Sequence, residues 1–282
     1  IVRKRPIFPK EINLGEIDCL SCLNPSIYIH EPKMKIDGIT KYIEDHEFVF
    51  DNVFGEHEKS ETVYKYSVEA TIDLIFLKGI ITCFAYGQTG SGKTFTMKGI
   101  QQSAIKSIFQ KNNDKKYDIF ISFFEIYSER LYDLLNGRNK LSVLEDKNQV
   151  VQIFGLEEKL VSSAEEMEAI INKANSERTT HNTVTNETSS RSHAICNIII
   201  KEKQCDEVHG KLTLVDLAGS ERAQETQSNN KARMTEGAEI NKSLLSLKEC
   251  IRGLDLRKGG NDNHVPFRNN KLTLVLRDSF LP

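Results

Sequence analysis

Long apolar runs are missing from this sequence. The longest one, near residues 72–86, is interrupted by Asp73 and Lys78. It is also shorter than the ~20 residues that a membrane-spanning helix needs. The first residues also lack the pattern of a signal peptide, so we expect none. We therefore expect no membrane partner for this protein.

Paired cysteines are scarce as well. Six cysteines are scattered over 282 residues, and only Cys19 and Cys22 form a CxxC pair. A zinc tetrahedron of this type needs a second pair, which the sequence does not contain. The pattern is typical of a reduced intracellular protein with incidental thiols, so we expect a cytoplasmic location.

Neither sign of charge is in surplus. The formal net charge is −2, although 28% of the residues are charged. Binding to an acidic polymer would therefore depend on a local patch rather than on the whole molecule. With 39% hydrophobic residues, a chain of this length can bury a full core, and we expect one large domain.

The apolar segments fall into two kinds. Strand-like runs alternate with segments in which apolar residues recur at helical spacing, which favours a central sheet flanked by helices, an α/β fold. The predicted strands cover residues 79–87, 118–127, 194–202 and 210–219, and the predicted helices cover 163–178 and 236–254.

The strongest chemical signal is "GQTGSGKT", residues 87–94, which follows a predicted strand and precedes a helix-compatible segment. This is the GxxxxGK[ST] phosphate loop in its proper context. Its glycines let the backbone N–H groups curl toward phosphate oxygens. Lys93 can reach the terminal phosphates, and the Thr94 hydroxyl can bind Mg²⁺.

Two further segments suit a sensor of the terminal phosphate. In "KLTLVDLAGSE", a predicted strand carries Asp216 toward the magnesium, and Gly219 of DxxG offers an N–H to the γ-phosphate. "NETSSRSH", residues 186–193, adds hydroxyls, a guanidinium and an imidazole in one loop. The guanine-reading NKxD motif is absent, which favours ATP over GTP.

Together these strings resemble a kinesin motor domain. The likeness is in family order and covers nearly the whole chain: "RKRP", "FAYGQTGSGKTFTM", "NETSSRSH", "VDLAGSER", "EGAEINKSLLSLKECI" and "HVPFRNNKLTLVLRDSF". It implies a mixed eight-stranded sheet between helices, an ATPase, and the microtubule as partner. It also implies a single motor domain over residues 1–282 that stops before the family's last helix, last strand and neck linker.

The resemblance assigns roles to individual residues. Ser190 and Asp216 would join Thr94 at Mg²⁺, and Ser189 would help to hold the attacking water. Arg191 and Glu221 would form an ion pair that closes the two switches, while Gly219 would report the γ-phosphate to the helix carrying Asn241. The catalytic set is thus Ser189, Arg191, Gly219 and Glu221.

The resemblance also outlines the nucleotide pocket. The residues expected there are Arg3, Arg5 and Pro6 around the adenine, the loop residues Gly87, Gln88, Thr89, Gly90, Ser91, Gly92, Lys93 and Thr94, and Phe95 beside the base. Phe95 departs from the family, because many kinesins have histidine there. Ser220 departs from the depolymerising class, which usually has asparagine at that position.

Two marks resemble that depolymerising, internal-motor class, kinesin-thirteen. "KID", Lys35 to Asp37, is similar to the lysine, valine, aspartate tip of its elongated hairpin. Lys248, Glu249 and Cys250 match its lysine, glutamate, cysteine sequence. The other interpretation of "KID" is an ordinary turn at a strand end.

A tubulin-binding surface is expected around the second mark. Apolar residues at helical spacing predict a buried stripe made of Ile240, Leu244, Leu247, Ile251 and Leu254, which turns Lys248, Glu249 and Arg252 outward. Residues 248–277 carry a local net charge of +4, which suits an acidic polymer. The expected tubulin contacts are Lys35, Ile36, Asp37, Lys248, Glu249, Cys250, Arg252, Arg268 and Lys271. Nucleic acid is not expected, because no reader motif accompanies the patch.

These observations predict an ATP-hydrolysing microtubule depolymerase acting on curved tubulin at filament ends. Two alternatives stay open: an ATP-driven transport motor, and a microtubule-binding or capping protein with incidental hydrolysis. We expect the protein on the cytoskeleton, at microtubule ends and on the mitotic spindle, as a homodimer joined through regions outside this sequence.

Overall fold

The computed structural model describes residues 1–282 except 148–149, 181–189, 204–206, 222–230, 259–263 and 281–282. It divides into two compact units, residues 1–70 and 71–282. Among the described residues, no helix is long and apolar enough to cross a membrane.

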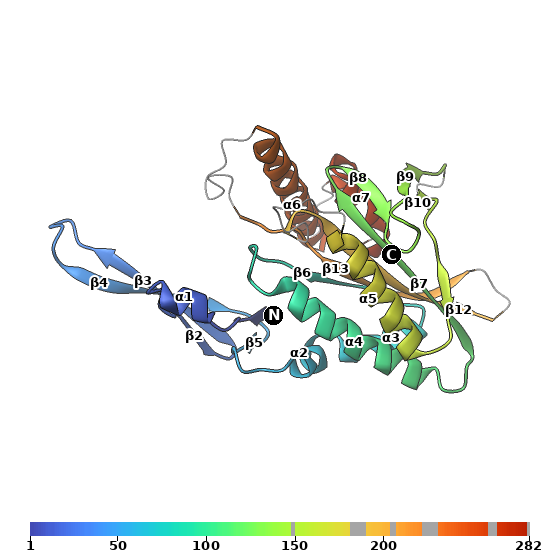
Figure 1. The fold of residues 1–282 in the computed structure, drawn as a ribbon, viewed down its shortest axis with the longest axis horizontal. Coiled ribbons are helices and arrows are strands. Elements are labelled where there is room, and N and C mark those ends of the chain that lie inside the picture. Colours follow the sequence, from blue (N-terminus) through green and yellow to red (C-terminus); the bar gives the residue numbers. More distant parts are fainter. Residues whose placement is uncertain (148–149, 181–189, 204–206, 222–230, 259–263, 281–282) are drawn as a thin grey trace. The chain divides into compact units, whose positions relative to one another are not determined.

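The first unit is built around a long antiparallel hairpin. Strand β3 (Ser26–Met34) pairs with β4 (Lys41–Val49) over its whole length, and β2 (Leu20–Leu23) pairs with the other side of β3 (Figure 1). This confirms the hairpin that ends in the KID tip. The remaining elements of the unit are β1 (Val2–Arg3), which runs parallel to β5 (Val53–Phe54), and the helices α1 (Pro9–Asn13) and α2 (Ser60–Ser67).

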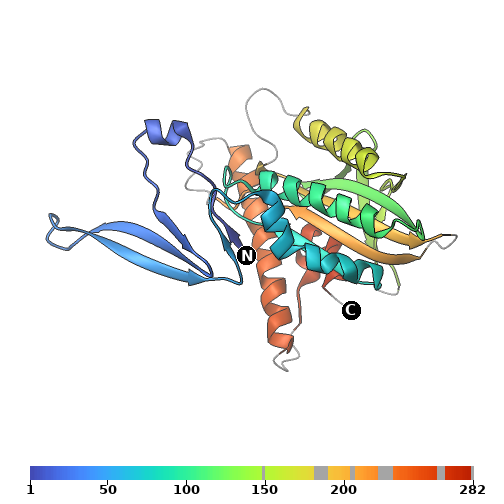
Figure 2. The same ribbon diagram turned by 90° about the horizontal axis from the view of Figure 1, so that it is seen from below.

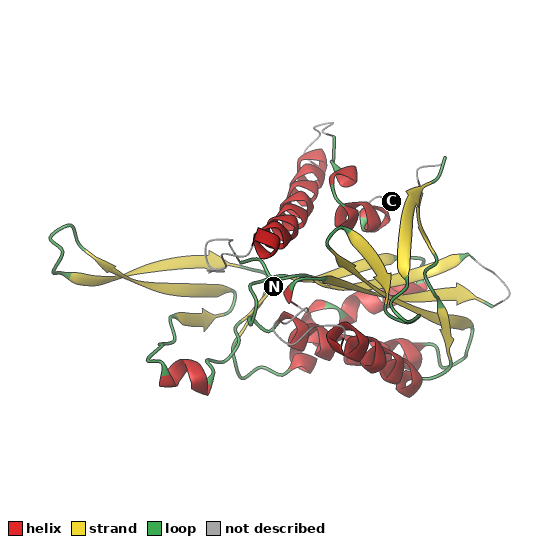
Figure 3. Cartoon of the chain, turned by 45° about the horizontal axis from the view of Figure 1, so that its top comes forward, coloured by secondary structure: helices red, strands yellow, loops and turns green. Residues whose placement is uncertain are grey.

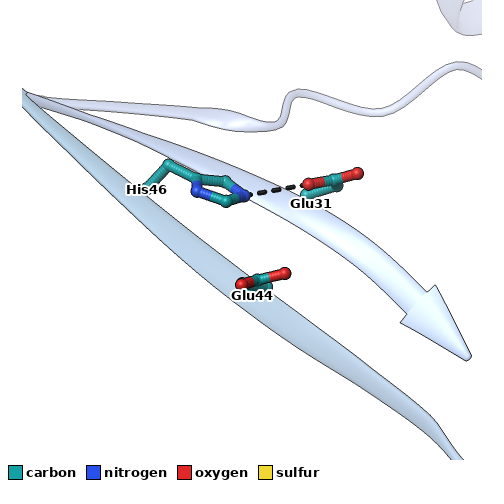
Figure 4. Close-up of side chains that lie close together, drawn as sticks. All are labelled: Glu31, Glu44 and His46. Carbon is teal, nitrogen blue, oxygen red and sulfur yellow. Dashed lines mark hydrogen bonds and ion pairs between the residues drawn. The ribbon is translucent and has the colours of Figure 1, made fainter. Parts of the chain in front are cut away.

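A cross-strand network braces the hairpin. Glu31 lies opposite Glu44, and His46 Nε2 is 2.9 Å from a Glu31 carboxylate oxygen (Figure 4). One ligand-type atom from each of the three residues lies within 4.8 Å of the others, as in a cation site. However, the Lys33 ammonium already contacts both carboxylates, at 3.2 Å from Glu31. The group is therefore an ion-pair network that holds the two strands in register.

The second unit contains the predicted α/β sandwich. Its sheet comprises β6 (Ile80–Ala85), β7 (Tyr117–Tyr127), β8 (Arg130–Asp133), β9 (Lys140–Glu145), β10 (Val151–Phe154), β11 (Lys159–Val161), β12 (His193–Glu202) and β13 (Val208–Asp216). The strand order is β10-β9-β8-β7-β12-β13-β6, with β11 on β7. Only β13 and β6 run parallel among these pairs, so the sheet is mixed, as predicted.

Helices cover both faces of this sheet (Figure 3). They are α3 (Glu69–Phe76), which begins at the end of the first unit, α4 (Lys93–Lys111), α5 (Ala164–Thr180), α6 (Lys231–Lys258) and α7 (Lys271–Val275), with 3₁₀ turns at Phe267–Asn269 and Arg277–Ser279. α6 is the long orange helix of Figure 2. The predicted strands and helices are confirmed, with boundaries that shift by a few residues.

Alternation along the central strands explains the two covered faces. Phe124, Ile195 and Val215 lie side by side on one face and pack with Leu244 and Leu247 of α6. Because successive strand residues point to opposite faces, the neighbouring positions face the helices on the other side. Burial on both faces accounts for the almost continuously apolar sequence of β7 and β12.

Candidate active site

The predicted functional segments meet at one edge of the sheet. β6 and β13 are parallel, with Ala85 opposite Asp216, so the loops that follow both strands leave from the same edge. β12 is antiparallel to β13 and begins at His193, so Ser190, Arg191 and Ser192 reach that edge too. Three sequence motifs that are far apart along the chain are therefore neighbours here.

The phosphate loop wraps around the first turn of α4. Gly90 and Gly92 have φ values of 76° and 92°, a conformation that a side chain would strain. The Lys93 ammonium donates to the carbonyl oxygens of Gly87 and Gln88, each at 2.8 Å. Partial burial lowers the pKa of Lys93. The loop thus directs one cation and the N-terminus of α4 at the same point.

A carboxylate rests on this loop. Glu221 accepts hydrogen bonds from the Thr89 backbone N–H at 2.9 Å and from the Thr89 hydroxyl at 2.6 Å. Partial burial raises the pKa of Glu221, but these hydrogen bonds outweigh burial and the net pKa lies below its ordinary value. An N–H and a hydroxyl that hold a carboxylate are the kind of donors that also suit a phosphate oxygen. A Cβ on Gly219 would lie within 2.6 Å of the Glu221 carboxylate and the Thr89 hydroxyl, so both side chains would have to move.

Asp216 is the centre of a second polar cluster. Its Oδ2 accepts from the Thr94 hydroxyl at 2.8 Å and from Arg178 Nη1 at 2.9 Å. Its Oδ1 is buried and has no hydrogen-bond partner among the described residues. A buried carboxylate oxygen beside a threonine hydroxyl is the hard oxygen set that Mg²⁺ prefers, so these residues fit the expected cation.

A backbone hydrogen bond joins the two expected switch segments, the one that contains Gly219 and Glu221 and the one that contains Ser190 and Arg191. The Gly219 N–H, which was expected to face the γ-phosphate, donates to the Ser190 carbonyl oxygen at 2.7 Å. Asn241 of α6 donates to the Glu221 carbonyl oxygen at 3.2 Å, so α6 contacts the same segment. Ser189, the expected water-holding residue, lies outside the described residues.

Arg191 has another partner than the expected one. Its Nη1 is 2.8 Å from Glu236 Oε2 on α6, while Glu221 is held by Thr89. The Arg191–Glu221 pair, which we expect when the γ-phosphate is bound, therefore stays a prediction.

Two buried polar residues at this edge make contacts that the sequence did not predict. Arg178 is buried at the end of α5 and bonds Ser192 as well as Asp216. His193 is buried between Ala218 and Ser243. Their motif neighbours were recognised, but no sequence spacing links residue 178 to 216 or 193 to 243. The sequence therefore gave no signal that would have found these contacts.

The residues expected around the adenine belong to different units. Arg3 bonds Ser60 and the Glu58 carbonyl oxygen, and Arg5 ion-pairs with Glu11 within the first unit. Pro6 follows Arg5 in that unit, whereas Phe95 lies on α4 in the second and is 68% exposed. Their arrangement around adenine stays a prediction.

The expected tubulin surface on α6 needs one correction. Lys248, Glu249 and Arg252 are exposed as predicted, but Cys250 is fully buried against Val265 and Phe267. A direct contact between tubulin and the Cys250 thiol was therefore the wrong interpretation of this mark. Burial raises the pKa of Cys250 to about 11.

The predicted buried stripe of α6 is confirmed at Leu244 and Leu247, while Ile240 and Leu254 are half-buried and one member is exposed. Ser243 and Ser246 are buried, whereas Ile251 is 47% exposed and lines an apolar cavity of about 490 Å³. The serines can be buried because their hydroxyls donate to the carbonyl oxygens of Ile240 and Lys242. Apolar spacing alone could not place the stripe, because buried serines do not register as apolar.

The net positive charge of residues 248–277 is partly neutralised in the fold. Arg268 donates twice to Glu145 of β9, at 2.9 Å each, and Arg277 contacts the same carboxylate. One acidic residue from outside the segment therefore offsets part of the +4 charge. Lys271 lies half-buried at the start of α7.

Comparison with known proteins agrees with this geometry. The kinesin motor domain family matches residues 3–281. The chain is 46% identical over 291 residues to Kinesin-like protein KIN-13B of Arabidopsis thaliana, which covers 100% of this chain. The chain spans 42% of the length of that relative. Motor domains of this family are microtubule-stimulated ATPases that bind nucleotide. The match confirms the predicted resemblance: this chain belongs to the kinesin motor domain family.

Proposed function

We propose that this chain hydrolyses Mg²⁺·ATP and uses the cycle to bend and release tubulin at microtubule ends. The observation that carries the nucleotide part is the Glu221 carboxylate on the Thr89 donors, because a loop that holds one anion through its N–H can hold another. ATP would displace Glu221, since two anions cannot share those donors.

The proposed roles combine these contacts with the family resemblance. Lys93 would turn from the loop carbonyls to the terminal phosphates, and Thr94, Ser190 and Asp216 would hold Mg²⁺. The cation would neutralise charge on the phosphate oxygens. Ser189 would orient the attacking water, and Gly219 would exchange the Ser190 carbonyl for the γ-phosphate.

ATP hydrolysis is tested by changing Lys93 to Ala. Because the variant loses the point charge that faces the terminal phosphates, we expect turnover to fall by at least roughly 100-fold with the fold intact. Lys98, exposed on the same helix, supplies the control variant Lys98→Ala. Normal turnover in a folded Lys93→Ala protein would contradict the assignment of the phosphate loop.

The hairpin tip supports the depolymerase part. Asp37 accepts from the N–H groups of Ile39 and Thr40, at 2.9 and 2.8 Å, and from the Thr40 hydroxyl at 2.6 Å. These bonds lower the pKa of Asp37. Asp37 thus stabilises the turn itself, and Ile36 is left fully exposed. A braced turn that presents an apolar side chain suits a contact surface better than a free loop does.

Such a tip gains affinity only by desolvation at an interface. An exposed charge pair formed by Lys35 is worth only ~0.5–1 kcal/mol. Burying Ile36 in a tubulin pocket together with that pair would supply the rest. On α6, Lys248, Glu249 and Arg252, with Arg268 and Lys271 nearby in sequence, would bind the filament lattice.

The depolymerase proposal is tested with the double variant Lys35→Ala/Ile36→Ala, which leaves the Asp37 turn unchanged. The length of stabilised microtubules is followed over time, with ATP and with a non-hydrolysable analogue. We expect the ratio of shortening rate to ATP turnover to fall at least about tenfold. The control is Leu160→Ala, which removes an exposed apolar side chain from β11.

The same assay separates the alternatives. Filaments that move without shortening would indicate a transport motor. Protected ends with either nucleotide would indicate a capping protein. If the double variant shortens filaments at the normal rate, the tip is an ordinary turn. The proposal includes a place at microtubule ends and on the spindle, and homodimers formed through regions outside this sequence.

A further inference from the structure

His193, the first residue of β12, has both ring nitrogens engaged. The Ala218 backbone N–H donates to Nδ1 at 3.0 Å, and Nε2 lies 2.8 Å from Ser243 Oγ. Because Nδ1 accepts, the ring proton is on Nε2 and donates to Ser243. The Ser243 hydroxyl in turn donates to the Ile240 carbonyl oxygen at 2.6 Å. These bonds form one continuous chain.

The two ends of this hydrogen-bond chain lie in segments with different proposed roles. Ala218 precedes Gly219, whose N–H is bonded to Ser190 in the first switch segment. Ser243 lies on α6, little more than one helical turn before the exposed Lys248. The imidazole therefore connects the phosphate-sensing backbone with the helix that carries the expected tubulin contacts.

We propose that His193 and Ser243 are positioning residues that transmit movement of the Ala218–Gly219 backbone to α6. The proposal rests on the proposed function, since it assigns the route by which the nucleotide site and the tubulin surface influence each other. If both segments shift during the proposed cycle, this hydrogen-bonded bridge would couple them physically, which closeness in space alone would not do.

The burial of His193 suits this role. Burial, together with the positive charges of Arg178 and Lys93, lowers the pKa of His193 to about 3. The ring therefore stays neutral at physiological pH, and Nδ1 remains an acceptor. Without it, the buried Ala218 N–H would lack a partner, which makes this contact costly to break.

Ser246 provides a matched control for Ser243. Both serines are buried on α6, and both donate to a carbonyl oxygen one turn earlier. The contact with His193 distinguishes Ser243. Ser243→Ala therefore removes the bridge, whereas Ser246→Ala removes only the same type of local bond. His193→Asn keeps an acceptor for Ala218 but is too short to reach Ser243.

The test measures tubulin-stimulated kcat and the KM for ATP in each folded variant. We expect Ser243→Ala to lower stimulated kcat by roughly fivefold or more and to change KM by less than about twofold. Ser246→Ala should stay near wild type, and Ser243→Thr, which keeps a hydroxyl, should recover most of the rate. His193→Asn combined with Ser243→Ala should be no slower than either alone, because both break one bridge.

Specific outcomes would overturn the coupling. These are normal stimulation in Ser243→Ala, an equal loss in Ser246→Ala, or additive losses in the double variant. If His193→Asn does not fold, the comparison of the two serines decides by itself. If the wild type shows no tubulin-stimulated turnover, the proposed function is wrong. If the wild type is stimulated but Ser243→Ala is equally active, only the coupling is wrong.

Discussion

The Arg191 side chain is ion-paired with a different carboxylate from the one expected in the ATP-bound state. It is ion-paired with Glu236, whose second carboxylate oxygen is buried and has no hydrogen-bond partner among the described residues. A cavity of about 20 Å³, the size of one water molecule, lies beside both side chains. Glu221, the expected partner, is engaged by Thr89 instead. Displacement of Glu221 by a phosphate would free it to compete for Arg191.

We therefore expect Arg191 to exchange Glu236 for Glu221 when ATP binds. Replacing Arg191 or Glu221 by Ala should slow single-turnover hydrolysis more than it weakens ATP binding, and the double variant should be no slower than the slower single. Without nucleotide, a double-mutant cycle of Arg191 and Glu236, measured by urea unfolding, should give an interaction free energy of about 0.5–3 kcal/mol. Strict additivity of Arg191 and Glu221 in log kcat would exclude the exchange.

At the scale of elements, α6 is both a core helix and a binding surface. Its burial pattern changes within one turn: Leu244 is 7% exposed and packs on the sheet, whereas the adjacent Leu245 is 55% exposed. The two faces therefore differ in what they contribute. The buried face stabilises the second unit, while the exposed face is free to contact a partner.

This difference predicts opposite results for adjacent leucines. Leu244→Ala should lower the free energy of unfolding by about 2–5 kcal/mol, because it removes buried methyl groups and leaves a cavity. Leu245→Ala should change it by less than about 1 kcal/mol, since its side chain is largely in water. Urea unfolding measures both, and equal costs would show that α6 packs with a different face.

At the scale of the whole molecule, His193 makes stability depend on pH. The group is neutral in the fold, with a pKa of about 3, and its ordinary pKa is 6.5. Below pH 6.5 the unfolded chain therefore binds a proton that the folded chain does not bind. Acid thus favours unfolding, and stability rises with pH across the interval between 3 and 6.5.

We expect the wild type to lose about 1.2 kcal/mol more than His193→Asn between pH 6 and 5. Urea unfolding at several pH values measures this difference in slope. Other titrating groups are common to both proteins and cancel in the comparison. Parallel pH profiles would mean that His193 is protonated in the fold.

The sequence by itself determined the phosphate loop, the α/β class, the kinesin family and the KID hairpin. Each depends on local signals: glycine spacing, strand and helix periodicity, or a run of adjacent residues. It also placed Lys248, Glu249 and Arg252 on the exposed side of a helix. These features depend on residues that are close together in the sequence, so they could be predicted before the structure was known.

Tertiary structure alone decided the contacts between distant residues. These include Arg178 with Asp216, Thr89 with Glu221, and Glu145 with Arg268. The burial of Cys250 and the exposure of Ile251 belong to the same class, since they depend on how α6 rotates against the sheet. Periodicity fixes a helical face only to within about one residue, and hydrogen bonds across the fold have no sequence spacing. The packing of the second unit therefore decided which charges pair and which remain for a partner.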